Sequence, residues 1–218
     1  MPQNKAINDL QKIVSLYQEG AVFVAVDTET TGSKPNVNRI MEIGAVKFSC
    51  NGLIEKFGTL INPQTSIDPF IVNITHITEE MVKDSPAAKD MLPDFLRFAN
   101  GCILIAHNVP FDTKFINAEF KRIHYPEMKN FTIDTVTLSR KTFPDILSHK
   151  LQYLAEYFGI EVQAAHRAYD DAYVCMKVFI KCVEQAKVII KEMQEKKKYA
   201  EEIKKINCQN MANMVLDL

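Results

Sequence analysis

The sequence predicts an α/β fold in which a mixed five-stranded sheet is flanked by helices. Three apolar, β-like runs at 21–27, 40–48 and 53–61 follow one another closely enough to form an antiparallel meander. Two later short runs, 102–106 and 131–133, alternate with helical patterns, as in successive β-α units. The chain of 218 residues is 47% hydrophobic, which is enough material for one core.

The chain before the first strand is predicted to form an N-terminal amphipathic helix within residues 1–20. Between residues 4 and 19 apolar side chains recur at helical spacing, and Gly20 supplies a stop signal. The apolar positions are Ile7, Leu10, Ile13, Val14 and Tyr17. This helix precedes the predicted central domain, which spans residues 21–186.

Turn signals divide the central domain. Asn51-Gly52 between the second and third strands predicts a hairpin. After Asn62-Pro63 the pattern becomes helical, and Pro110 is well placed as the first residue of a later helix. Helices are expected near 67–73, 78–83, 90–99, 110–123, 134–141 and 150–158, and from 169 onward.

The C-terminal part, residues 187–218, differs in composition from the rest. It is rich in Lys and Glu, with mixed charges through KEMQEKKKYAEEIKKI and a sparse apolar stripe. One interpretation is a solvated helix that extends the last helix of the core. The alternative is a helix that docks on a partner or forms a dimer seam, and the oligomeric state stays open.

Charge and composition narrow the class of protein. A net charge of -1 argues against holding a duplex or a membrane by bulk electrostatic attraction, although a local metal site could still meet phosphates. The five cysteines form no C-x-x-C pair, which is typical of buried thiols in a reducing compartment. There is no secretory signal and no apolar run of about 20 residues, so we expect a soluble cytoplasmic protein without a membrane partner.

The stretch VFVAVDTETTG, residues 22–32, ends a buried strand with two acids. Asp27 and Glu29 are two residues apart, so both project from the same face of the strand. Taken alone, such a pair is more typical of an ordinary polar strand end, with threonines capping the turn that Gly32 completes. Further acids must join the pair before it indicates chemistry.

A third acid comes from AHNVPFD, residues 106–112. Asp112 falls in the first turn of a predicted helix, where the dipole favours an anion even without a function. The side chains at helical spacing after it are mostly apolar, so Asp112 shares the core-facing side. His107 and Asn108 follow a buried strand at its C-terminal end, where open α/β sheets tend to bind ligands.

HRAYDDA, residues 166–172, offers two candidates for a fourth acid. Counting three, four, seven and eleven residues from Asp171 reaches only Val and Cys, whereas the same count from Asp170 reaches a tyrosine, a valine and two lysines. Asp171 is therefore expected to face the core and Asp170 to face water or cap the helix. His166 lies on the loop that enters this helix.

The sequence thus predicts four inward acids and one histidine near strand or helix ends. Four carboxylates close together would repel and raise one another's pKa unless divalent cations neutralised them. Oxygen ligands favour Mg²⁺ or Mn²⁺ over zinc. Two such ions, roughly 3.5–4 Å apart, can clamp the attacking and leaving oxygens of a phosphoryl displacement. His166 could then accept the proton of the attacking water.

DTETTG (27–32), HNVPFD (107–112) and HRAYDD (166–171) resemble the three motifs of the DEDDh 3′→5′ exonuclease superfamily. That superfamily has a ribonuclease H-like fold and includes the proofreading epsilon subunits of bacterial DNA polymerase III. The similarity runs from about Val22 to Phe179. Two departures from the family pattern are His76, where glycine is usual, and Ser33, where an apolar residue often follows TTG.

The resemblance assigns roles to individual residues. It implies that Asp27, Glu29, Asp112 and Asp171 hold two metal ions and that His166 is the general base. Contacts to the terminal nucleotide are expected from five further residues. These are Thr28, Thr30, Thr31, His107 and Phe111. Asp134 resembles another family position, but helix capping explains it as well.

The predicted function is a metal-dependent 3′→5′ exonuclease that releases nucleotides from single-stranded DNA, in proofreading or repair. Its domain would be residues 21–186, and a DNA polymerase is the expected partner, with the N-terminal helix and residues 187–218 as candidate docking surfaces. One alternative is an exoribonuclease or oligoribonuclease that trims RNA 3′ ends. A non-enzymatic alternative is an idle subunit that binds nucleic acid.

Overall fold

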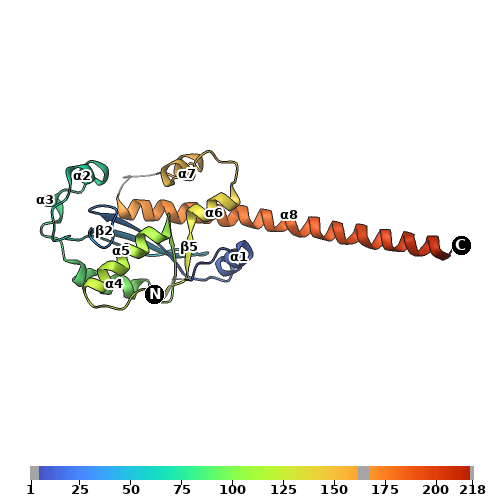
Figure 1. The fold of residues 1–218 in the computed structure, drawn as a ribbon, viewed down its shortest axis with the longest axis horizontal. Helices are drawn as coiled ribbons and strands as arrows, with labels where there is room; N and C mark the ends of the chain where they lie inside the picture. The colour runs from blue at the N-terminus through green and yellow to red at the C-terminus, as the bar shows by residue number, and fades with distance from the viewer. Residues whose placement is uncertain (1–4, 162–166, 217–218) are drawn as a thin grey trace.

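The computed structural model describes residues 5–161 and 167–216, with side chains described as far as Lys204. These residues form a five-stranded sheet with helices on both faces, and one long helix projects from the body (Figure 1). The α/β fold with a mixed sheet that the sequence predicts is confirmed.

The strand order explains why the sheet is mixed. The strands are β1 (Phe23–Thr30), β2 (Ile40–Ser49), β3 (Gly52–Leu60), β4 (Ile103–Ala106) and β5 (Thr132–Asp134). They are arranged as β3-β2-β1-β4-β5, with β1 antiparallel to β2 and parallel to β4. The first three strands form the expected meander, closed by the hairpin at Asn51-Gly52. The central strand β1 therefore lies at the junction between the antiparallel and the parallel half of the sheet.

Two groups of helices cover the two faces of the sheet. The helices are α1 (Leu10–Gln18), α2 (Pro69–Thr75), α3 (Glu79–Val82), α4 (Ala88–Phe98), α5 (Val109–Arg122), α6 (Thr135–Thr142), α7 (Leu151–Tyr157) and α8 (Ala168–Leu216). One core cluster joins α1, α6, α7 and α8 to the sheet, and the other joins α4 and α5 to it. Along β1, Phe23 and Ala25 belong to the first cluster, and Val24 and Val26 belong to the second. This alternation decides which side chains at the end of β1 meet which helix.

The first helix begins later than the sequence pattern predicts. Asp9 accepts a hydrogen bond from the Lys12 amide at 2.7 Å and caps α1, so the helix begins at Leu10. Ile7 lies before the cap, and its amide donates to the Thr132 carbonyl at 2.8 Å, beside β5. An apolar residue at this position fits a helix or an extended segment equally well, which explains the difference. Ile13 and Val14 of α1 are buried in the core cluster that contains α8.

The last helix combines a core segment with an extension. Side chains of α8 are buried as far as Ala186, and residues 191–204 are all exposed. In Figure 1 the second half of α8 runs well beyond the body. Within the described residues, none of the helices combines the length and apolar character needed to cross a bilayer.

Candidate active site

The two acids of β1 face the helix layer that contains α8. Asp27 and Glu29 continue the face on which Phe23 and Ala25 pack against the first core cluster. Both side chains are partly buried, and their backbones lie opposite Gly44 and Glu42 of β2. This face of β1 is therefore apolar along most of the strand and acidic at its C-terminal end.

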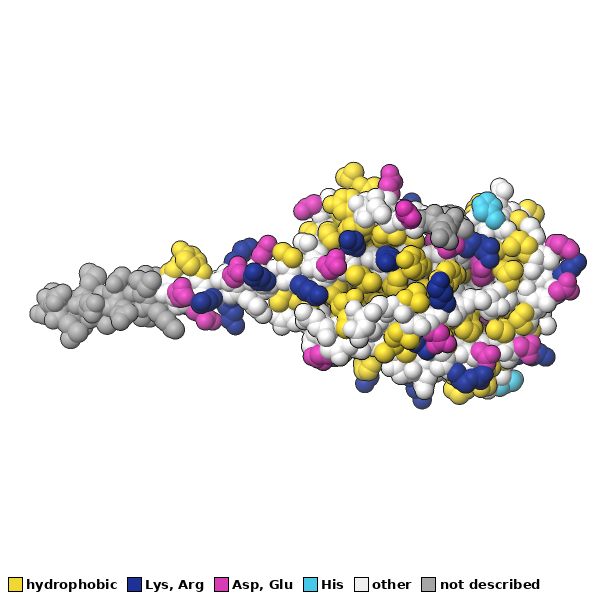
Figure 2. Space-filling view, turned by 180° about the vertical axis from the view of Figure 1, so that it is seen from behind, with side chains coloured by type: hydrophobic (Ala, Val, Ile, Leu, Met, Phe, Trp, Pro, Cys, Tyr) yellow, Lys and Arg dark blue, Asp and Glu magenta, His cyan; other side chains and the backbone are white. Residues whose placement is uncertain are grey.

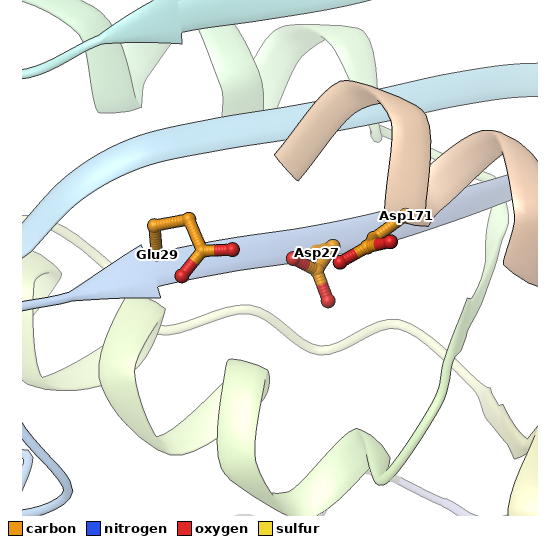
Figure 3. Close-up of side chains that lie close together, drawn as sticks. All are labelled: Asp27, Glu29 and Asp171. Atoms are coloured by element: carbon orange, nitrogen blue, oxygen red, sulfur yellow. The ribbon is translucent and has the colours of Figure 1, made fainter. Parts of the chain in front are cut away.

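Helix α8 brings a third carboxylate to the same point. Oxygens of Asp27, Glu29 and Asp171 all lie within 4.8 Å of one another. Figure 3 shows the two acids on β1 and Asp171 on α8 with their carboxylates directed toward one another. Asp171 is only 7% exposed, whereas its neighbour Asp170 is partly exposed. The helical phase inferred from the sequence therefore distinguishes the two aspartates correctly.

Asp112 approaches the same strand end from the other face of the sheet. It lies in the first turn of α5 and is 2% exposed. Its Oδ1 accepts a hydrogen bond of 2.9 Å from the Thr28 hydroxyl, which points to the α5 side of β1. The negative charge of Asp112 is also among the causes that raise the pKa of Asp27. All four predicted acids are thus gathered around the end of one strand.

Burial and mutual repulsion shift the ionisation of these acids. Burial, followed by the charges of Asp112, Glu29 and Asp171, raises the pKa of Asp27 well above its usual range. Burial and the neighbouring acids raise the pKa of Glu29 to about 8. Burial raises the pKa of Asp112 to about 7, although the Thr28 hydrogen bond opposes the shift. Ionised carboxylates at this spacing require positive charge between them.

The donor set fits hard divalent cations. All of its atoms are carboxylate oxygens, which suit Mg²⁺ or Mn²⁺, and no sulfur or imidazole ligand is among the three clustered residues. The pKa shifts have the direction expected of a site whose charge is balanced by a bound cation. His166, the predicted general base, lies outside the described residues.

Arg167, the next residue after His166, forms an ion pair that the sequence reasoning missed. Its Nη2 lies 2.7 Å from Glu42 Oε1, and its Nε contacts both carboxylate oxygens of Glu42. Glu42 Oε2 also accepts the amide of Ala168, the first residue of α8, at 3.1 Å. Glu42 is only 5% exposed, so this pair fixes the start of α8 on β2. An acid inside the apolar run IMEIGAV was the available signal.

Gly44 lets the same helix start approach β2 closely. A Cβ atom at Gly44 would lie 2.1 Å from the Tyr169 amide nitrogen and 2.2 Å from the Ala168 carbonyl carbon. Backbone atoms cannot yield at such distances, so only glycine permits this packing. Because Asp27 lies opposite Gly44, the close approach also sets the distance between β1 and Asp171.

Two of the four acids, Asp27 and Asp171, open into a cleft of about 970 Å³. Asp27 and Asp171 line one part of it, and residues of α6, of the α6–α7 connection and of the start of α7 line another. His107 bridges the two parts. Its Nε2 lies 2.8 Å from the His149 carbonyl, and its Nδ1 lies 2.9 Å from the Thr135 hydroxyl.

The other residues expected to contact substrate are also bonded within the chain. Besides Thr28, Thr30 donates its hydroxyl to the Gly32 carbonyl at 2.7 Å, and Thr31 accepts the Arg39 amide at 3.0 Å. The Phe111 ring packs on Phe115, with ring centroids 4.9 Å apart. The threonine hydroxyls therefore build the strand end and the turn that follows it.

Asp134 is a helix cap, as the sequence suggests. Its Oδ1 accepts the Thr137 amide at 2.8 Å at the start of α6. Its Oδ2 accepts the Val109 amide at 2.8 Å at the start of α5, where Asn108 makes no side-chain cap and has a positive φ of 82°. One carboxylate thus accepts an amide in the first turn of each of two helices.

Comparison with known sequences gives consistent matches. A family model described as Exonuclease matches residues 24–179. The DNA polymerase III subunit epsilon of Treponema pallidum (strain Nichols) is 44% identical over 163 residues, which are 74% of this chain and 76% of that protein. The PolC-type DNA polymerase III of Caldanaerobacter subterraneus subsp. tengcongensis is 41% identical over 174 residues, which are 79% of this chain but only 12% of that protein.

Solved structures share the fold. Exonuclease X, solved in complex with 5′ overhanging duplex DNA, aligns with a TM-score of 0.61 and 28% identity over 74% of this chain and 91% of its own. E. coli exonuclease I, solved in complex with a dT13 oligonucleotide, aligns with a TM-score of 0.66 and 21% identity. That alignment covers 74% of this chain and 41% of exonuclease I.

Proposed function

The chain belongs to the exonuclease family, and we propose that, as a 3′→5′ exonuclease, it releases nucleotides from single-stranded DNA with two bound divalent cations, Mg²⁺ or Mn²⁺. The observation that carries the proposal is the set of carboxylate oxygens of Asp27, Glu29 and Asp171 within 4.8 Å of one another. Carboxylates alone cannot neutralise one another, so the proposal includes bound cations.

The roles of the acids follow from their placement. Asp27, Glu29 and Asp171 would hold the ions from one side of β1. Asp112 would complete the set from the α5 side, with the Thr28 hydroxyl fixing one of its oxygens. When bound, the ions would supply the positive charge that activates the attacking water and stabilises the leaving 3′-oxygen.

His166 is proposed to accept the proton from the attacking water. Support comes from the family motif and from the anchoring of the next residue, since Arg167 and the Ala168 amide are both bonded to Glu42. A base must be held within hydrogen-bond reach of the proton that it removes. We propose that the Glu42–Arg167 pair contributes to turnover by anchoring the chain at Arg167, where α8 begins.

The relatives favour DNA as the substrate. Those that match in sequence are named as DNA polymerase III proteins, and exonuclease X was solved with DNA. A single strand is favoured because the terminal nucleotide must separate from a partner strand to reach the acids. The expected nucleotide contacts of Thr28, Thr30, Thr31, His107 and Phe111 stay predictions. With their polar groups engaged in the chain, these residues would offer backbone, methyl and ring surfaces.

We propose a proofreading role and a polymerase partner because the chain is similar to an epsilon subunit. The idle-subunit alternative is disfavoured because four acids of the family motif are kept together at the strand end. The cytoplasmic location stays a prediction. So does the use of α1 or of residues 187–218 in docking.

A paired digestion tests the function. The protein is incubated with Mg²⁺ and either 5′-labelled single-stranded DNA or RNA of the same sequence. A stepwise ladder on DNA that a chelator abolishes is the expected result. Faster shortening of the RNA would select the RNA-trimming alternative, and hydrolysis of neither strand with Mg²⁺ or Mn²⁺ would contradict both enzymatic functions.

A further inference from the structure

The cleft that contains Asp27 and Asp171 has a second wall outside the family motifs. The lining residues of this wall include Arg140 of α6, Leu147 in the α6–α7 connection, and Lys150 just before α7. Arg140 and Lys150 are both exposed, and Leu147 is 92% exposed. We call these three residues the cationic wall.

We propose that the cationic wall binds the nucleotides that precede the terminal one in a single strand, with Arg140 and Lys150 on phosphates and Leu147 against a base. The proposal rests on the proposed function, because it concerns the same substrate in the same cleft. It assigns a subsite to residues that take no part in the acid cluster.

Charge arrangement supports the wall as the path of the strand. The acids at one side of the cleft can approach phosphate only through bound cations, whereas the opposite side presents Arg140 and Lys150. Asp134 also lines the cleft, but its carboxylate accepts two backbone amides. Arg140, Leu147 and His149 line the same cleft, and the positive charge of Arg140 lowers the pKa of His149 after the larger effect of burial. Proteins that bind single strands combine such cations with flat or apolar side chains that receive the bases.

The exposed side chain of Leu147 is suited to contact a base in this cleft. A single exposed leucine is ordinary on a protein surface. Here, however, the leucine lines the cleft of the acids with cations on both sides of it in the sequence. A base that stacked on it would cover apolar surface on both partners without any requirement for base identity.

His107 fixes the wall relative to the acids. Its Nε2 must carry the hydrogen in the 2.8 Å bond to the His149 carbonyl, because a carbonyl only accepts. The His149 ring is held in turn, with Nδ1 3.0 Å from the Ser139 hydroxyl. His107 follows β4 directly and lies five residues before Asp112. The wall therefore has a fixed distance from the acid cluster, as a subsite for successive nucleotides requires.

Two substrates distinguish an effect on the cationic wall from an effect on the acid cluster. The first is the p-nitrophenyl ester of thymidine 5′-monophosphate, which has no preceding nucleotide, and the second is a DNA strand of about twelve nucleotides. The test variant is Arg140→Ala with Lys150→Ala. The control variant, Lys89→Ala with Lys129→Ala, removes the same charge from exposed residues outside the cleft lining.

The expected result has three parts. With the test variant, kcat/KM for the strand falls about tenfold at low salt, and turnover of the ester is unchanged. The slope of log kcat/KM against log salt concentration becomes shallower by about 1.4, since each lost phosphate contact on a single strand contributes about 0.7. The control variant leaves all three quantities at the wild-type value.

Leu147→Ala tests the apolar contact separately. We expect kcat/KM for the strand to fall about fivefold with the salt slope and ester turnover unchanged, because an uncharged contact releases no counterion. Ile54→Ala, which removes an exposed apolar side chain from β3, is the matched control and should have no effect.

The outcomes distinguish the two proposals. If wild-type protein hydrolyses both substrates and the Arg140/Lys150 variant keeps the wild-type slope and kcat/KM, the subsite is overturned and the function stands. A parallel loss of ester and strand turnover also overturns the subsite, since it shows a structural effect on the acid cluster. If wild-type protein hydrolyses neither substrate, the proposed function fails and the subsite fails with it.

Discussion

At the scale of single residues, the acids of β1 hold their protons more tightly than free carboxylic acids do. Burial and neighbouring charges raise the pKa of Asp27 and bring that of Glu29 to about 8. Both shifts mean that ionisation opposes folding when cations are absent. This energetic cost is the expected counterpart of a site that binds cations strongly.

We predict that the metal-free protein loses stability as pH rises. Glu29 has a pKa of about 8 in the folded chain and roughly 4.3 when unfolded, so between these values the folded state binds more protons. Stability is therefore greatest below the lower value and declines up to the higher one. The melting temperature should fall more steeply from pH 5 to pH 8 in wild-type protein than in Glu29→Gln.

Divalent cations should counteract this loss of stability at high pH. Mn²⁺ should raise the wild-type melting temperature more at pH 8 than at pH 5, because it binds the ionised acids. Histidines affect wild-type protein and Glu29→Gln alike, so the difference between them isolates the acids. Equal slopes in the two metal-free proteins would contradict the assigned cause.

Local sequence patterns predicted much at the residue scale. Helical phase separated Asp171 from Asp170 because both belong to one helix and their neighbours define its faces. The structure also explains why the family usually has glycine at position 76, because His76 closes α2 with a φ of 57°, a conformation that favours glycine. The bond from Thr28 to Asp112 spans 84 positions and follows from packing that no local pattern encodes.

At the scale of elements, the approach of α8 to β2 positions Asp171. Gly44→Ala would place a Cβ atom 2.1 Å from the Tyr169 nitrogen, so the start of α8 must move. We predict a loss in kcat of about 100-fold, since a shift near 1 Å misplaces Asp171, together with about 1–3 kcal/mol of lost stability. Initial rates on labelled DNA and chemical denaturation measure the two effects.

Gly58→Ala is the matched control for Gly44→Ala. Gly58 pairs with Gly44 across β2 and β3, but a Cβ atom there would meet only the Tyr169 Cβ at 3.7 Å, an ordinary contact. Its activity should stay within about twofold of wild type. Similar losses in the two variants would show that α8 placement is not what Gly44 protects.

The Glu42–Arg167 pair should matter for turnover more than for binding. Glu42→Gln keeps the shape but removes the charge and one acceptor from Arg167 and Ala168, loosening the start of α8. We expect kcat to fall at least about tenfold with KM little changed, and stability to fall by about 2 kcal/mol, less than for a fully buried pair. Steady-state kinetics and denaturation provide the values.

Glu55→Gln controls for loss of a glutamate in an ion pair. Glu55 contacts Lys47 at 2.8 Å but is an exposed residue of β3. Its loss should cost no more than about 0.5 kcal/mol and leave kcat unchanged. If Glu42→Gln behaved in the same way, the pair would have no positioning role.

The sequence predicts the type of each element better than it predicts the contacts between elements. The five strands and the mixed character of the sheet follow from apolar runs, a hairpin signal and alternation with helices, whereas the strand order comes from the structure. The start of α1 was wrong because Ile7 fits the helical period and yet pairs beside β5. The apolar run around Glu42 marks it as a buried acid, but its partner Arg167 lies 125 positions away, and no local pattern reveals that pairing.

At the scale of the whole molecule, α8 links the active site to an extension that leaves the body. Acidic and basic side chains are intermixed along the coloured part of the extension in Figure 2. Met193, Tyr199 and Ile203 are among its exposed residues. The mixed pattern fits a solvated helix and a docking helix equally well, which is why the sequence left both interpretations open.

We predict that the extension is dispensable for chemistry. A chain that ends at Glu195 keeps Ile190, which packs on the core cluster shared with α1, but loses the exposed part of α8 beyond it. Its ester turnover should remain within about twofold of the full chain. A large loss, with folding intact by circular dichroism, would assign the extension a role in the site. Sedimentation of both chains reports any self-association through it.

The central claim is that the acids at the end of β1 hold two divalent cations. Titration calorimetry with Mn²⁺ on wild-type protein, Asp171→Asn and Asp170→Asn tests it most directly, because it requires neither substrate nor turnover. We predict about two ions per chain for wild type and Asp170→Asn, and loss of at least one ion for Asp171→Asn. Absence of Mn²⁺ binding to wild type, or equal loss in both variants, would contradict the claim.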